Sequence, residues 1–328
     1  MKRTARKALK LFVLGLVGVQ LVACSSDGPS RTAEYAVQGL YSAALSPQGD
    51  YALVGSIQHG GSYWKTSVNE RRFNWNHAQG EFTPHISLDI DPTGAYAVTG
   101  GARTMVLWNT TTGQSEGFWN TPGDIRSLKL NRNGNFALVG MDDQTARFFD
   151  VKNGGIKQTF RTGAVVRSVD LDDSGDLALT GDDKFNVTLW DVKTGLIKQQ
   201  WPLSNRIATV ALSDDGELAF GAAQLGNAKV WSTKTGEEVL DISTGKLPNR
   251  RTTISRAVFG PDKRFLLTGG INSDVRLISL ADGADQRKWS LQLKDKLRPT
   301  GSSVLALAFG SDQKYYALGS NGLLNVLE

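Results

Sequence analysis

From about residue 40 onward, hydrophobic and polar positions repeat one pattern along the chain. An alternating apolar stretch is followed by a polar turn, a second alternating stretch that ends near a glycine, and a third that ends near an aromatic residue. Alternation with a period of two, broken by Asp, Asn, Gly and Pro, is typical of short antiparallel strands. The first two stretches with their turn read ALSPQGDYALVG, SLDIDPTGAYAVTG, LKLNRNGNFALVG, VDLDDSGDLALTG, VALSDDGELAFG, AVFGPDKRFLLTG and LAFGSDQKYYALG. The pattern therefore predicts an all-β chain of seven repeats.

Each repeat has a fixed spacing of packing positions. The glycines that close the second stretch are 40 to 50 residues apart, at Gly55, Gly100, Gly140, Gly181, Gly221, Gly269 and Gly319. The third stretch ends at Trp64, Trp108, Phe149, Trp190, Trp231, Ile278 and Leu327. Eleven positions later in the first six repeats come Trp75, Trp119, Phe160, Trp201, Ile242 and Trp289. All eight tryptophans fall in these two columns, which predicts four strands per repeat and a structural role for the tryptophans.

The repeat resembles the WD-repeat family. The matching residues are Trp190-Asp191, its variants Phe149-Asp150 and Trp108-Asn109, and turns such as Ser46-Pro47-Gln48-Gly49. The resemblance implies a seven-bladed β-propeller of four-stranded blades over residues 34–328. Two features depart from the family: its Gly-His pair is absent, and the Asp six residues before the Trp is clear only at Asp143. We therefore expect the family's buried Asp, His, Ser/Thr and Trp network to be missing.

The two ends of the chain complement each other. The seventh repeat stops at LLNVLE, on its third strand. Residues 34–38, EYAVQ, have strand character and precede the first complete repeat. Pairing these segments would complete the last blade and remove an exposed sheet edge. We predict closure of the ring by the N-terminal strand.

The first 23 residues have the pattern of a secretory signal peptide. Five Lys/Arg precede about thirteen mostly apolar residues, too few to span a bilayer, which takes about 20. The following residues, Leu21-Val22-Ala23-Cys24, resemble a bacterial lipoprotein cleavage box, which implies lipidation of Cys24, the only cysteine. By the same resemblance, Ser25 implies anchoring to the outer membrane on its periplasmic side. Residues 24–33 are expected to be the lipidated cysteine and a polar tether.

Removal of the signal peptide changes the charge balance. The full chain carries a net charge of +5, but residues 1–23 hold five basic residues and no acidic ones. The mature chain is then close to neutral, so its composition gives no support to nucleic-acid binding.

Three long connections between predicted blades open on one face, together with the turns between second and third strands. The face that carries these connections and turns is called the inter-blade face below. Two of these connections are basic, and long loops are where binding residues tend to lie. We predict that they bind an anionic partner of the cell envelope: an acidic protein loop, lipid A phosphates or peptidoglycan carboxylates. The alternative is ordinary solvated charge. The residues are Lys246, Arg250, Arg251, Arg256, Lys294, Lys296 and Arg298.

Other candidate residues are weaker. The three histidines, His59, His77 and His85, fall in loops of the first blade and are enough in number for a zinc or copper site, although a structural role is preferred. First strands supply mostly small polar residues to the channel: Ser42, Ser87, Ser127, Ser168 and Thr209. Three arginines, Arg126, Arg167 and Arg206, are candidates for an anion site at the channel mouth; alternatively, they pair with Asp170 or Asp172.

The chain contains no Ser, His and carboxylate grouping, nucleophile elbow or phosphate-binding loop. We therefore predict a monomeric, non-catalytic scaffold without a cofactor, which binds protein partners in the cell envelope. The alternative is a propeller enzyme, hydrolase or quinoprotein-like, or a small-ligand or anion binder that uses the central channel.

Overall fold

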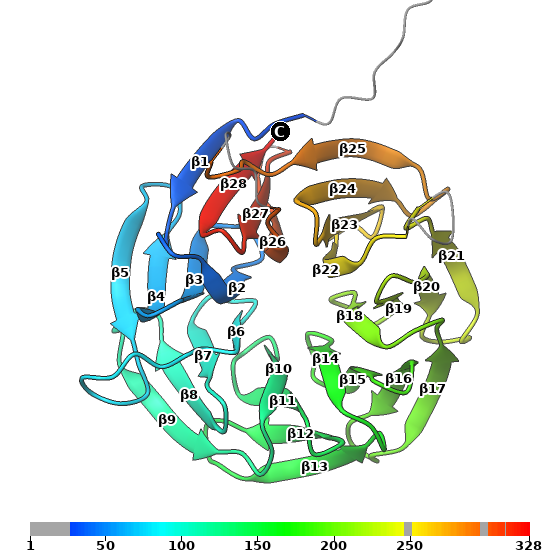
Figure 1. The fold of residues 1–328 in the computed structure, drawn as a ribbon. Coiled ribbons are helices and arrows are strands. Elements are labelled where there is room, and N and C mark those ends of the chain that lie inside the picture. The colour runs from blue at the N-terminus through cyan, green and yellow to red at the C-terminus, as the bar shows by residue number, and fades with distance from the viewer. Residues whose placement is uncertain (1–26, 246–250, 296–300, 312) are drawn as a thin grey trace, which may run out of the picture.

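The computed structural model describes residues 27–245, 251–295, 301–311 and 313–328. Seven four-stranded antiparallel sheets stand around a central channel, so the protein is a seven-bladed β-propeller (Figure 1). This confirms the predicted fold class. Among the described residues there is no helix long and apolar enough to cross a membrane.

Every blade places its first strand innermost and its fourth outermost (Figure 1). The innermost strands are β2 (Leu40–Leu45), β6 (Ser87–Ile90), β10 (Ile125–Leu130), β14 (Val166–Leu171), β18 (Ile207–Leu212), β22 (Ile254–Phe259) and β26 (Val304–Phe309). The second strands are β3 (Tyr51–Ser56), β7 (Tyr96–Gly100), β11 (Phe136–Met141), β15 (Leu177–Asp182), β19 (Leu218–Ala223), β23 (Phe265–Gly270) and β27 (Tyr315–Gly319).

The outer half of each blade follows the same order. The third strands are β4 (Gly60–Lys65), β8 (Thr104–Asn109), β12 (Thr145–Asp150), β16 (Asn186–Asp191), β20 (Ala228–Ser232), β24 (Asp274–Ser279) and β28 (Leu323–Leu327). The outermost strands are β5 (Glu70–Trp75), β9 (Ser115–Asn120), β13 (Ile156–Arg161), β17 (Ile197–Pro202), β21 (Glu238–Ile242), β25 (Asp285–Ser290) and, in the seventh blade, β1 (Arg31–Glu34).

The N-terminal strand closes the ring, as predicted, but three residues earlier than expected. β1 pairs antiparallel with β28, from Arg31 opposite Val326 to Glu34 opposite Leu323. Tyr35 follows the last residue of β1. Its aromatic ring stacks on Trp64 of the first blade, with ring centroids 4.5 Å apart. The described part of the expected tether also packs on the ring: the Asp27 N–H donates to the Lys288 carbonyl at 3.0 Å.

The two tryptophan columns meet between neighbouring blades. The outer-strand aromatic of one blade lies against the third-strand aromatic of the next in the pairs Trp75–Trp108, Phe160–Trp190 and Trp201–Trp231, with centroids 5.1, 5.3 and 4.9 Å apart. Three outer-strand indoles also donate to a carbonyl of the next blade: Trp75 to Gly113, Trp201 to Gly236 and Trp289 to Glu328. Tyr35 on Trp64 makes the equivalent contact at the closure. The apolar core is thus distributed around the ring, between the blades.

Two blades retain parts of the network that we expected to be absent. In the fourth blade the Trp190 indole donates to the Thr180 hydroxyl at 2.9 Å, and the second blade retains more. The Trp108 indole donates to the Thr99 hydroxyl at 2.8 Å, and that hydroxyl lies 2.8 Å from Nε2 of His77. Nδ1 of His77 lies 2.6 Å from the Thr104 hydroxyl. The expectation that the network is missing is therefore wrong for the second blade. His77 enters the network from the connection before that blade, and because Asn76 and not a glycine precedes it, the sequence shows no Gly-His pair there.

Candidate functional site

The innermost strands of all seven blades line a central cavity of about 420 Å³. Successive side chains of each strand point to opposite sides, so every second position shares one side of its blade. The blade register therefore arranges equivalent positions as rings around the channel. Two such rings carry most of its polar groups.

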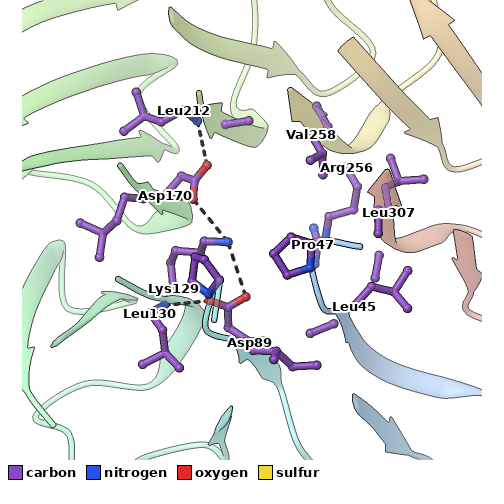
Figure 2. A pocket seen from close by; sticks show the side chains of 18 of the residues that line it. Leu45, Pro47, Asp89, Lys129, Leu130, Asp170, Leu212, Arg256, Val258 and Leu307 are labelled. Carbon is purple, nitrogen blue, oxygen red and sulfur yellow. Dashed lines mark hydrogen bonds and ion pairs between the residues drawn. The ribbon is translucent and has the colours of Figure 1, made fainter. Parts of the chain in front are cut away.

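One wall of the channel carries an ion-pair ladder, which Figure 2 shows from close by. Lys129 of β10 lies between Asp89 of β6 and Asp170 of β14, with its Nζ 3.6 and 3.9 Å from their carboxylate oxygens. Each carboxylate also accepts a backbone N–H of the next blade. Asp89 accepts from Leu130 at 2.8 Å and Asp170 from Leu212 at 2.7 Å. The ladder therefore fastens blades two to five to one another.

The ladder perturbs the protonation of its members. Burial raises the pKa of Asp170 to about 6, because loss of hydration outweighs the attraction of Lys129. Burial raises the pKa of Asp89 for the same reason. For Lys129, burial acts to lower the pKa, but the two carboxylates outweigh it and raise the pKa above its usual range. Lys129 is therefore charged at neutral pH, whereas the pKa values of both carboxyl groups are raised toward neutral pH.

The ring of small hydroxyls, two residues before the ladder in each strand, is structural. The hydroxyls of Ser87, Ser127 and Ser168 each accept a backbone N–H of the next blade, at 3.1 to 3.2 Å. The Ser42 hydroxyl instead donates to the His85 carbonyl at 2.6 Å. Sequence reasoning found these positions, and the structure shows that they join neighbouring blades.

The opposite wall carries no charged side chain at the register of the ladder. At the register of the ladder it carries Ala44, Ala211, Val258 and Ala308. At the register of the hydroxyl ring stands Arg256 of β22, which projects into the channel (Figure 2). We expected Arg256 in a partner-binding loop. That placement is wrong, because the basic connection ends before it and β22 starts at Ile254.

The three arginines predicted at the channel mouth are not among the residues that line the cavity. Arg167 makes two 2.8 Å hydrogen bonds to Asp183, and Arg126 lies 3.7 Å from Asp142. Both partners are in or beside the second-to-third-strand turn of the same blade, so the expected alternatives Asp170 and Asp172 are not the partners. The Arg167 hydrogen bond lowers the pKa of Asp183, with Arg206 adding a smaller attraction.

The predicted basic loops are described only in part. Lys246, Arg250, Lys296 and Arg298 lie outside the described residues, as do the signal peptide and Cys24. Lys294 is held by the closing segment: its Nζ is 2.7 Å from Glu34 and 2.7 Å from the Ala36 carbonyl. Arg251 is half-buried. A single positive patch stays a prediction.

Two of the three histidines meet: the rings of His77 and His85 make an edge contact with centroids 5.0 Å apart. Both ring nitrogens of His77 face threonine hydroxyls, and Nε2 of His85 lies 3.0 Å from the Trp75 carbonyl. His59 is exposed and stacks on Phe82, with centroids 5.9 Å apart. Among the described residues no group of three His, Cys, Asp or Glu is placed to hold a metal ion. Burial lowers the pKa of His77 and of His85 to about 4, so both are neutral structural groups.

Sequence reasoning missed a set of exposed apolar side chains on the inter-blade face. Phe185, Leu225 and Ile271 occupy the second-to-third-strand turns of three adjacent blades and are 43%, 57% and 38% exposed. Phe185 and Leu225 have left-handed backbones, with φ of 72° and 49°. The Leu225 turn is anchored, since its N–H donates to the Thr253 hydroxyl at 2.9 Å. Further exposed apolar residues of this face are Val37, Tyr41, Phe82 and Ile86.

The fold and these two surfaces define a class of protein: a β-propeller with a charged channel and an apolar set of turns on one face. Comparison with protein-family models and with curated proteins gives no match. The WD-repeat resemblance therefore rests on the residues that carry it.

Proposed function

We propose that this chain is a non-catalytic interaction scaffold of the WD-repeat type. It binds a protein partner through the inter-blade face and is anchored by lipid at Cys24 to the periplasmic side of the outer membrane. The observation that carries the proposal is the set Phe185, Leu225 and Ile271, three exposed apolar side chains on adjacent turns. Exposed apolar residues that gather on one face mark interaction sites more often than scattered ones do.

Backbone strain supports a binding role for two of them. A bulky residue with a left-handed backbone is an outlier, and such strain costs about 1–3 kcal/mol. Glycine or asparagine would adopt the same turns at lower cost. The presence of Phe and Leu at two positions that suit glycine or asparagine therefore favours a function for the side chains of Phe185 and Leu225. The antiparallel blades hold the turns in place, so a partner would meet a preformed surface.

Photo-crosslinking in intact cells tests the binding face. A photo-reactive amino acid would replace Phe185 or Leu225 in the full chain, with Cys24 intact. The matched control is Leu196, which is 67% exposed in the turn between β16 and β17, on the opposite face. We expect a discrete crosslinked protein from positions 185 and 225 and none from 196. The substitutions Phe185→Asn and Leu225→Asn, which suit the turns, should abolish its capture in pull-downs. Equal crosslinking at 196, or unchanged capture by both variants, would contradict the proposal.

The anchor has a separate test. Metabolic labelling with an alkyne-bearing palmitate should label the wild-type chain and not a Cys24→Ala variant, which should move to the soluble fraction. Membrane association that survives Cys24→Ala without label would refute lipidation while leaving the proposed binding face intact.

A further inference from the structure

Arg256 breaks the symmetry of the channel. Five blades carry Ser or Thr at its register, and the seventh carries Ala306. The hydroxyls of Ser87, Ser127 and Ser168 at this register join blades through hydrogen bonds of 3.1 to 3.2 Å. A large cation in this ring needs another explanation, because a charge without a counter-ion in a narrow channel is costly.

The Arg256 guanidinium is only partly satisfied. Its Nε donates to the Leu305 carbonyl and its Nη1 to the Ser255 carbonyl, both at 2.8 Å. A guanidinium has five N–H donors, so three have no acceptor among the described residues. Its side chain is exposed, but to the water of the channel that the first strands enclose. Loss of hydration lowers the pKa of Arg256, and within the described residues no carboxylate opposes this effect.

The charges that face Arg256 across the channel favour a ligand with one negative charge. Besides Arg256, the lining holds four carboxylates and two cations. The carboxylates are Asp89, Asp170, Asp173 and Asp214, and the cations are Lys129 and Arg132. A dianion such as phosphate would gain Arg256 but would be repelled by this excess of carboxylates. A carboxylate matches the planar fork of a guanidinium and carries a single charge.

The space beside Arg256 is suited to an apolar group. Val258 at this wall is half-buried, and the alanines at positions 44, 211 and 308 are buried, whereas blades two to four carry the ladder at the same register. Small side chains there leave the cavity open. Its volume of about 420 Å³ lies within the range of small-molecule sites, about 300–1,000 Å³.

We infer that the channel binds a small monoanionic organic acid, with its carboxylate on the free N–H groups of Arg256 and its apolar part against Val258 and the alanine wall. This site is distinct from the inter-blade face and does not depend on the proposed partner.

Calorimetric titration of the full chain tests the inference with hexanoate and benzoate as probes and with hexanamide, benzamide and inorganic phosphate as comparisons. We expect at least one acid to bind at least tenfold more tightly than its amide and more tightly than phosphate. Arg256→Met should weaken that acid at least tenfold. Arg256→Lys should weaken it less, because it keeps the charge but loses the paired donors. The matched control Arg206→Gln removes a guanidinium that does not line the cavity and should leave binding unchanged.

Several results would overturn the inference: no binding of either acid, acids and amides that bind equally, preferred binding of phosphate, or equal loss in Arg206→Gln. Circular dichroism first establishes that each variant is folded. Where Arg256→Met does not fold, the comparison of acid with amide on the unsubstituted chain and the Arg256→Lys variant decide the matter.

Discussion

The ion-pair ladder predicts an unusual pH dependence for one residue. In the folded protein the pKa of Asp170 is raised from its usual 3.8 to about 6. The folded state therefore holds this proton more tightly than the unfolded state does. Between pH 4 and 6 the folded state binds more protons at this site, so its contribution to stability falls as pH rises through that window. This is opposite in sign to the usual behaviour of an ion-paired carboxylate.

The magnitude follows from the size of the shift. One pKa unit corresponds to 1.36 kcal/mol, so a rise from 3.8 to about 6 amounts to about 3 kcal/mol across the whole window. Between pH 7 and pH 5 the part realised is about 1 kcal/mol. The substitution Asp170→Asn keeps an oxygen for the Leu212 N–H but removes the titration. Relative to this variant, the wild type should gain about 1 kcal/mol of stability when pH falls from 7 to 5.

Urea unfolding at pH 7 and pH 5 measures this difference. The variant must be compared with the wild type at each pH, because His77 and His85 destabilise the fold over the same window. The matched control is Asp183→Asn: the pKa of Asp183 is lowered, so its contribution is lost only as pH falls below about 4. A difference between wild type and Asp170→Asn that is the same at both pH values would refute the reasoning, as would an equal pH effect in Asp183→Asn.

Three further substitutions test the ion-pair ladder, the closure of the ring and the buried His85. Lys129→Met leaves two buried carboxylates without their cation and should cost roughly 2 kcal/mol at pH 7, below the 3–5 of a fully buried pair because Lys129 is 33% exposed; urea unfolding measures it, and an unchanged midpoint would show that the ladder contributes nothing. Tyr35→Ala removes a buried aromatic at the closure and should cost about 3–5 kcal/mol, whereas Tyr41→Ala, at an exposed tyrosine, should change the unfolding midpoint little. His85→Gln should reduce the loss of stability between pH 7 and pH 5 by about 2 kcal/mol, because a buried histidine with a pKa near 4 must gain a proton on unfolding; an identical pH profile would contradict this.

The local repeat of the sequence determined the fold. Alternation with a period of two and turn residues act over a few positions, so the seven copies, their four strands and the two tryptophan columns were all predictable. The incomplete last repeat also predicted closure by the N-terminus. The position of that strand at Arg31–Glu34 was not predictable, because it depends on where Tyr35 meets Trp64 of another blade.

Only the tertiary structure decided which side chains share the channel and which share a face. Arg256 looks like one more basic residue at the end of a basic loop, and its neighbours in the sequence give no hint of Lys129, Asp89 and Asp170 across the channel. Those groups meet because seven first strands, each separated by some 40 residues of chain, are brought into one ring by packing between blades. Likewise His77, which lacks the expected glycine before it, joins Thr99 and Trp108 of the next blade. Sequence patterns record local backbone preferences, whereas channel chemistry depends on contacts across the ring.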